Sequence, residues 1–206
     1  MMAGNKNLLL FLLSLSLIAF LSCDTKNQTA IEKNQSGKGI PLRVTQLDVG
    51  KVIDENATTF ILVRHAEKEK EVKDPGLTEK GIKRAKNLYQ VLEKIPIQVF
   101  YSTDFHRTKM TVEQTALMRN LDGNVKIYDH RDLEGAAKQM LNDHSKKVVL
   151  VSGHSNTTPE MINILTKTED WQPLSESDYD NLFIISVYEN APAKVQHFKY
   201  GEPNHE

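Results

Sequence analysis

Cysteine is almost absent from this chain of 206 residues, which contains a single one, Cys23. One cysteine cannot form a disulfide within the chain or a cysteine-based metal cluster. The chain also lacks an excess of either charge, because 26 basic and 27 acidic residues give a formal net charge of −1. Bulk charge therefore gives no sign of a nucleic-acid partner. No His, Asp and Glu residues have the spacing of metal ligands, so the sequence implies neither a metal nor any other cofactor.

An apolar run near the start, residues 8–21, is interrupted only by two serines. Lys6 precedes it, and Ser22 and Cys23 follow it, which is the layout of a signal peptide. A membrane-spanning helix is the competing interpretation, but the run is shorter than the ~20 apolar residues that a span needs. The final FLSC resembles a bacterial lipoprotein cleavage site, at which Cys23 is lipidated and becomes the first mature residue. We therefore expect an exported protein, held to a membrane of the cell envelope by lipid on Cys23 and facing the periplasm or the outer surface.

The chain divides into three parts. We expect residues 1–22 to form the lipoprotein signal peptide, residues 23–56 a lipidated N-terminus and polar tether, and residues 57–206 the folded domain. The tether is rich in Asn, Lys, Gln, Thr, Ser and Gly, as flexible linkers are, although we expect residues 42–49 to pack. Removal of the signal peptide takes away one basic residue and no acidic one, so the mature chain carries a formal charge of −2.

Within the domain, buried apolar runs alternate with amphipathic segments. Strands are predicted at residues 60–63, 97–101, 125–128, 148–152, 182–188 and 195–200, and helices at residues 78–94, 105–119, 132–144 and 158–167. This alternation predicts a mainly parallel sheet covered on both faces, a three-layer α/β/α sandwich. Ile82 is expected in the core from the first helix, and Met110, Leu117 and Met118 from the second. Thr158 is the predicted N-cap of the fourth helix.

Polar side chains follow three of these strands directly. The first strand runs into Arg64 and His65, the second into the segment that contains Arg107, and the fourth into His154. Ligand sites in open α/β folds lie outside the carboxyl ends of the strands, so these residues are expected to meet there. A guanidinium group binds two phosphoryl oxygens at once. A histidine can be kept neutral by small effects of its surroundings, as a nucleophile requires. Each of these four residues, taken alone, can be explained as a loop or packing residue. Taken together, they indicate a site that binds a phosphoryl group and reacts with it.

The segments FILVRHAEK, YSTDFHRT and VVLVSGHSN, with LTEKG at Leu77–Gly81 and Ala85 beyond it, closely resemble the histidine phosphatase superfamily. This superfamily comprises the phosphoglycerate mutase-like proteins, and the likeness is to its short first branch. It extends over roughly residues 59–200 and includes four motifs in the family's order. It implies a phosphoglycerate mutase-like fold.

By this resemblance His65 is the nucleophile and passes through a phosphohistidine. We expect Arg64, Arg107 and His154 to be catalytic residues that bind the phosphoryl oxygens of the substrate. Asn156 is a further candidate for substrate binding, although a residue at a helix entry is also explained by structure alone.

The proton donor for the leaving group stays open. First-branch members often carry a glutamate before the second histidine, and here Asp132 and Glu134 are the candidates, although both also suit the start of a helix. Glu67 is a third candidate. The His-Asp acid of the second branch is absent, because Ser155 follows His154. No role is expected for the remaining histidines, which have polar or surface-like contexts: His106, His130, His144, His197 and His205.

Three functions fit these residues, and a fourth, that of a mutase, fits less well. The favoured one is a metal-independent phosphatase that acts on a small phosphate monoester outside the cytoplasm. A phosphoglycerate mutase is disfavoured, because the chain between Arg107 and His154 lacks room for the insertion typical of those enzymes. A protein phosphohistidine phosphatase suits the compact core but conflicts with export. A lipid-tethered module that binds a phosphorylated ligand without turnover is the third, although none of the four residues is missing.

Overall fold

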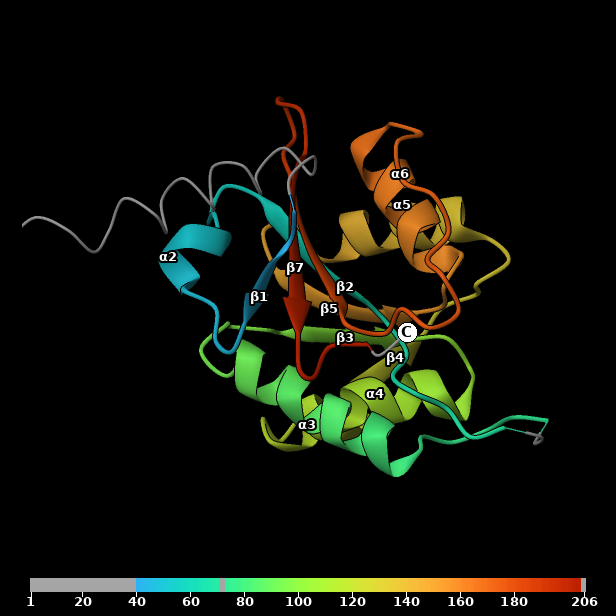
Figure 1. Ribbon diagram of the computed structural model, residues 1–206. Coiled ribbons are helices and arrows are strands. Elements are labelled where there is room, and N and C mark those ends of the chain that lie inside the picture. The colour runs from blue at the N-terminus through green and yellow to red at the C-terminus, as the bar shows by residue number, and fades with distance from the viewer. Residues whose placement is uncertain (1–39, 71–72, 205–206) are drawn as a thin grey trace, which may run out of the picture.

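The computed structural model describes residues 40–70 and 73–204. In this part of the chain one sheet contains seven strands in the order β1-β7-β6-β2-β5-β3-β4 (Figure 1). The strands are β1 (Leu42–Val44), β2 (Thr58–Arg64), β3 (Val99–Ser102), β4 (Val125–Ile127), β5 (Val148–Gly153), β6 (Asn181–Val187) and β7 (Lys194–Tyr200). β6 runs antiparallel to β2 and β7, and the other four pairings are parallel. The predicted mainly parallel sheet is confirmed.

Helices cover both faces of the sheet. They are α2 (Val49–Val52), α3 (Glu79–Leu92), α4 (His106–Leu117), α5 (Leu133–Asp143) and α6 (Thr157–Thr166), with a short 3-10 turn at Asp122–Asn124. Figure 1 shows α3 and α4 below the sheet and α5 and α6 above it. The predicted three-layer α/β/α sandwich is therefore confirmed.

β2 lies in the middle of the sheet and contributes to both halves of the core. Ile61 and Val63 pack with the α3 and α4 side, whereas Phe60 and Leu62 pack with the α5 and α6 side. A strand covered on both faces has no polar face, which explains why this run is continuously apolar. Its polar residues begin only where the strand ends.

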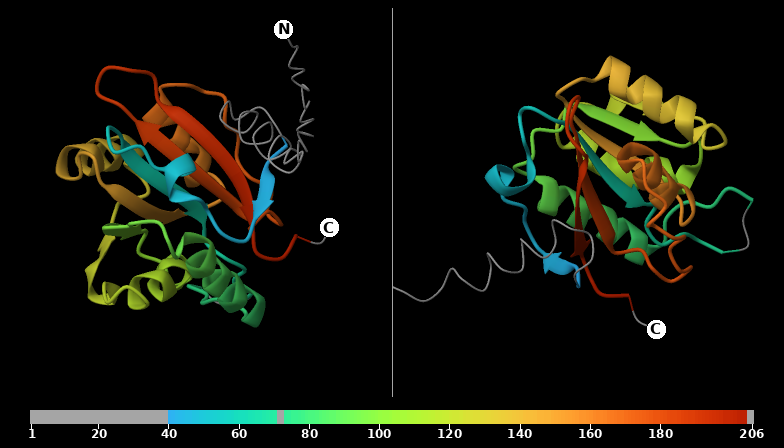
Figure 2. Two further views of the ribbon diagram at one scale, coloured as in Figure 1. Left: turned by 90° about the vertical axis from the view of Figure 1, so that its left-hand side faces the viewer. Right: turned by 90° about the horizontal axis from the view of Figure 1, so that it is seen from above.

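The segment before β2 is partly packed. β1 pairs in parallel with β7, and Figure 2 shows the two side by side at one edge of the sheet. Leu47 is buried in the core on the α3 side. Packed structure thus begins inside the segment assigned to the tether. The predicted signal peptide, Cys23 and the first part of the tether lie outside the described residues. Within residues 40–70 and 73–204, no helix is long and apolar enough to cross a membrane.

Three expected core positions are wrong. Ile82, Leu117 and Met118 are 41%, 53% and 51% exposed. On α4 the buried face instead carries Val112, Ala116 and three threonines. The hydroxyl of Thr111 accepts a hydrogen bond from the backbone N–H of Ala66 at 2.9 Å, so this face is selected by polar contacts as well as by apolar area.

The start of α6 also differs from the prediction. Asn156, not Thr158, is at the N-cap, and its side chain makes no capping hydrogen bond. The hydroxyl of Thr157 accepts a hydrogen bond from the backbone N–H of His154 at 2.9 Å. Because this bond holds the turn after β5 tightly, α6 begins at Thr157, two residues before the first helical position that an N-cap at Thr158 predicts.

Candidate active site

The register of the parallel strands brings the two predicted site histidines together. Arg64 at the end of β2 is opposite Gly153 at the end of β5, and the N–H of His65 donates to the carbonyl of Gly153 at 2.9 Å. His65 and His154 therefore follow neighbouring strands at the same edge of the sheet. Their ring centroids are 5.6 Å apart.

Hydrogen bonding determines which nitrogen of His65 is free. Nδ1 is 2.8 Å from the carbonyl oxygen of Ala66. A carbonyl oxygen only accepts, so Nδ1 carries the proton and Nε2 keeps its lone pair. Burial lowers the pKa of His65 to about 3, and the charges of Arg64 and Arg107 contribute to the lowering. The ring is thus neutral near pH 7, with Nε2 available as a nucleophile.

His154 is held between a hydroxyl group and a guanidinium group. Nη2 of Arg107 lies 3.4 Å from Nδ1 of His154, and Nε2 of His154 lies 3.0 Å from the hydroxyl of Thr103. Because a guanidinium only donates, Nδ1 accepts and Nε2 carries the proton. Burial, followed by the charge of Arg107, lowers the pKa of His154 to about 4. The guanidinium of Arg107 also lies 4.3 Å above the ring of Phe105.

A loop of the C-terminal half surrounds the buried guanidinium of Arg64. Nη1 donates to the carbonyl oxygens of Ser175 and Glu176 at 2.7 and 3.1 Å, and the ring of Tyr179 lies 4.2 Å from the guanidinium carbon. The carboxylate of Glu176 accepts from Nη2 of Arg64 and from the hydroxyl of Ser155, both at 3.1 Å. Two donors at the mouth of the site thus converge on one carboxylate group.

Two donors of the site have no acceptor among the residues that the structure describes. The Nε–H groups of Arg64 and Arg107 are buried, and neither has a hydrogen-bond partner within the described residues. A buried N–H without a partner is costly, and it is satisfied when a ligand oxygen arrives. This end of the sheet is therefore suited to an anion with several oxygens. Among residues 40–70 and 73–204, no group of three or more His, Cys, Asp or Glu side chains is arranged to hold a metal ion.

The structure does not bring the candidate acids to this cluster. Asp132 is the N-cap of α5 and accepts from the N–H of Gly135 at 2.9 Å, and Glu134 is exposed in the first turn of the helix. Neither makes a hydrogen bond or ion pair with the four site residues in the part of the chain described. Asn156 precedes α6 with an exposed side chain.

Glu67 has a structural partner instead. Its carboxylate pairs with Arg84 at 2.7 Å and with Lys80 at 3.4 Å. Burial alone would raise the pKa of Glu67, but the hydrogen bonds and charge of Arg84 outweigh it and hold that pKa below its usual value. A carboxylate kept ionised in this way is a poor proton donor.

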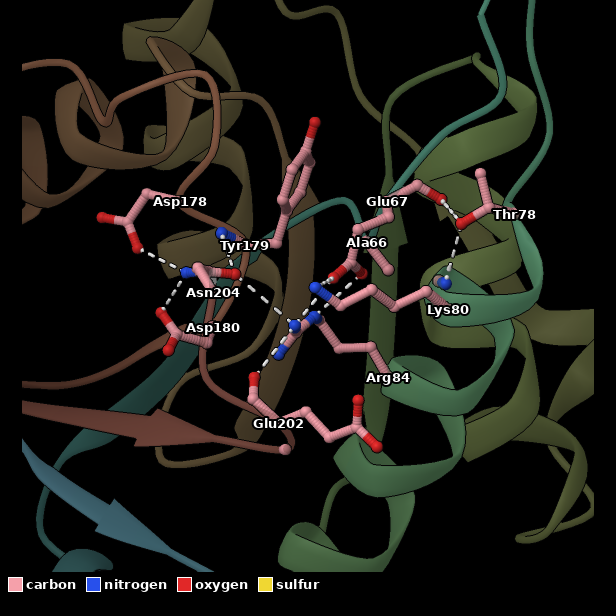
Figure 3. A network of polar contacts seen from close by, with 12 residues as sticks. Ala66, Glu67, Thr78, Lys80, Arg84, Asp178, Tyr179, Asp180, Glu202 and Asn204 are labelled. Atoms are coloured by element: carbon pink, nitrogen blue, oxygen red, sulfur yellow. Dashed lines mark hydrogen bonds and ion pairs between the residues drawn. The ribbon is translucent and has the colours of Figure 1, made fainter. Parts of the chain in front are cut away.

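The network around Arg84 connects the loop after β2 to the C-terminal segment (Figure 3). Besides pairing with Glu67, the buried guanidinium of Arg84 donates to the carbonyl of Glu202 at 3.0 Å. Asn204 accepts from the N–H of Tyr179 at 3.3 Å and donates to Asp180 at 2.7 Å. Hydrogen bonds through Asn204 thereby connect the loop that carries the aromatic ring over Arg64 to the C-terminal segment.

Sequence reasoning missed Tyr179, Glu176 and His130 at the site. The Tyr179 ring centroid is 5.9 Å from that of His65, and no sequence signal marks it. His130 was expected to be a surface residue, but its half-buried ring lies 5.8 Å from that of His154, centroid to centroid. A signal existed for His130, because it closely follows the carboxyl end of β4, just as the other site residues follow their strands.

Comparison with known proteins agrees with this geometry. Residues 60–136 match the model of the histidine phosphatase superfamily (branch 1), and this segment includes Arg64, His65 and Arg107. This segment, from β2 to the start of α5, is thus similar to branch 1 of the histidine phosphatase superfamily.

Two further comparisons identify individual proteins that are similar to this chain. Phosphoserine phosphatase 1 of Hydrogenobacter thermophilus is 41% identical over 70 residues, which are 31% of this chain and 33% of that enzyme, so the match spans about a third of its length. The structure of the protein histidine phosphatase SixA complexed with tungstate has a TM-score of 0.58 at 15% identity, covering 69% of this chain and 97% of that one. The phosphoserine phosphatase mutant of Entamoeba histolytica in complex with phosphoserine has a TM-score of 0.53 at 14% identity, covering 67% and 94%. These structures share the fold.

Proposed function

We propose that this protein is a phosphatase that hydrolyses a small phosphate monoester through a phosphohistidine on His65. The observation that carries the proposal is the hydrogen bond from Nδ1 of His65 to the carbonyl of Ala66. It leaves the Nε2 lone pair of a neutral, buried imidazole free beside the guanidinium groups of Arg64 and Arg107. A module that only binds phosphate has no need of such a nucleophile.

The reaction proceeds in two displacements at phosphorus. In the first, Nε2 of His65 attacks in line, the P–N bond forms and the P–O bond to the leaving group breaks. Arg64 and Arg107 neutralise the charge on the phosphoryl oxygens, and most of the catalysis comes from this placement. In the second, water attacks phosphorus and the P–N bond breaks, which restores His65.

No metal ion takes part in this mechanism. The two guanidinium groups supply two positive charges, which is the contribution that a bound cation makes in other phosphoryl-transfer sites. His154 supports Arg107 through Nδ1, and its own orientation is fixed by the hydroxyl of Thr103.

Hydrolysis of para-nitrophenyl phosphate by the full chain, with a chelator present, tests the proposal. We expect turnover that survives the chelator and is abolished in His65→Ala. With labelled substrate, a phosphoenzyme that is labile in acid and stable in alkali should be trapped in the wild type only. Phosphate binding without turnover, in the wild type and in His65→Ala alike, would instead support a lipid-tethered binding module.

The choice of substrate is a second question. The relation to phosphoserine phosphatase 1 supports a small alkyl phosphate. A protein phosphohistidine is the alternative, because the protein histidine phosphatase SixA shares the fold. Comparing kcat/KM for O-phosphoserine and for a phosphohistidine peptide distinguishes the two.

We also propose that the enzyme works in the cell envelope, attached to a membrane through lipid on Cys23. The support is the sequence before this residue, an apolar run that ends in FLSC. Incorporation of a labelled fatty acid into the wild type, and its loss in Cys23→Ser, is the expected result. Equal labelling of both would contradict the assignment.

A further inference from the structure

His130 belongs to the same ring cluster as the phosphate-binding residues. Its ring centroid lies 5.4 Å from that of Phe105 and 5.8 Å from that of His154. The ring centroid of Phe105 lies 5.2 Å from that of His154, and the guanidinium of Arg107 lies over the Phe105 ring. Of the charged groups around His130, Arg107 contacts the same two rings, those of Phe105 and His154, and Asp129 and Arg131 are the chain neighbours of His130.

The proposed reaction needs a proton that the four family residues cannot supply. An alkoxide leaves phosphorus readily only if its oxygen is protonated as the bond breaks. His65 is the nucleophile, and its one N–H is held by Ala66. The N–H of His154 is held by Thr103, and a guanidinium does not release its protons.

The carboxyl groups do not fill this role. Asp132 caps α5, Glu134 is exposed at its start, and Glu67 is paired with Arg84. His130, in contrast, lies beside His154, and its half-buried ring has no hydrogen bond to another residue described in the structure. Imidazole is the side chain that can both give and take a proton near neutral pH.

We propose that His130 is the proton donor to the leaving group, a proposal that rests on the function given above. In the first displacement protonated His130 gives its proton to the departing oxygen, so the products are an alcohol, neutral His130 and phosphohistidine at His65. In the second, neutral His130 takes a proton from the attacking water. The P–N bond breaks, inorganic phosphate leaves, and both histidines return to their starting states.

A pair of substrates with different leaving groups tests this role. Para-nitrophenolate is a stable anion and departs without taking up a proton. The serine oxygen of O-phosphoserine must be protonated as it departs. kcat/KM reports on P–O cleavage, so His130→Gln should lower it by about 100-fold or more for O-phosphoserine and by less than about 10-fold for para-nitrophenyl phosphate. Asp132→Asn and Glu134→Gln are the matched controls, and we expect both to leave the two values unchanged.

The outcomes separate this inference from the proposed function. Equal losses for both substrates in His130→Gln, or no loss for either, would overturn the role of His130 while leaving the phosphatase intact. Loss of O-phosphoserine hydrolysis in a control variant would transfer the role to that carboxylate. A wild type that neither turns over nor forms a phosphoenzyme would overturn the proposed function and this inference with it. Turnover of the aryl substrate by His130→Gln also shows that the variant is folded.

Discussion

The carboxylate of Glu176 lies 3.1 Å from Nη2 of Arg64, joining an 82% exposed acid to a buried guanidinium. Its other oxygen accepts from the hydroxyl of Ser155. An anion of this chain thus occupies donors at the mouth of the site to which we assign a phosphoryl group. A substrate phosphate must compete with this carboxylate or bind beside it.

Glu176→Gln should therefore strengthen the binding of phosphate. An ion pair with one exposed partner contributes at most about 1 kcal/mol, so we expect KM and the inhibition constant of inorganic phosphate to fall by up to about fivefold. Asp170→Asn is the matched control, because it removes a negative charge from the same loop without contacting Arg64. If both variants change the inhibition constant equally, net charge rather than the contact with Arg64 is responsible.

Acid should destabilise the fold through its buried histidines. Burial lowers the pKa of His65 to about 3 and that of His154 to about 4, from an ordinary value of 6.5. Below pH 6.5 the unfolded chain therefore binds more protons than the folded one, and the free energy of unfolding falls as the pH is lowered from about 6.5 to about 4. Above this range the two histidines contribute no pH dependence.

Denaturant unfolding at several pH values between 7.5 and 4.5 checks this expectation. Each such histidine contributes a slope of up to about 1.4 kcal/mol per pH unit. His65→Gln removes one titrating group, so its curve should be flatter than that of the wild type. Parallel curves for the two proteins would show that His65 is not a source of the acid sensitivity.

Arg84→Met should be among the most destabilising substitutions in the chain. It leaves the carboxylate of Glu67 partly buried without its main partner, and breaking a buried pair in this way costs about 3–5 kcal/mol. Lys80→Met is the control, because Lys80 contacts the same carboxylate from an exposed position. We expect this substitution to lower the free energy of unfolding by less than about 1 kcal/mol. Midpoints of urea unfolding give both values, and equal losses would contradict a special role for Arg84.

Gly81→Ala should disturb the loop that follows the nucleophile. A Cβ at Gly81 would overlap the carbonyl oxygen of Glu67, two residues beyond His65, and this neighbour is backbone that cannot rotate away. We expect a loss of about 1–3 kcal/mol in stability and a lower kcat. Gly123→Ala is the control, since nothing lies within 4 Å of a Cβ there. Unchanged stability and kcat in Gly81→Ala would show that this close approach is not needed.

Local chemistry determined much of this protein from the sequence alone. The apolar run before Arg64 predicted a strand covered on both faces, and the polar residues after it predicted where the site lies. Thr78 and Asp132 were recognised at the starts of α3 and α5, because a capping side chain bonds to N–H groups within three residues of it. These features depend on residues that are neighbours in the chain, so they can be recognised directly from the sequence.

Tertiary structure decided what surrounds those residues. Tyr179 and Glu176 reach Arg64 from more than 100 positions along the chain, and His130 meets His154 only because β4 and β5 flank β3 in the sheet. The direction of the Ala66 carbonyl group determines which nitrogen of His65 keeps its lone pair. The ion pair between Glu67 and Arg84 depends on how α3 packs. Contacts of this kind arise from the register and packing of distant segments, which no local pattern of residues specifies.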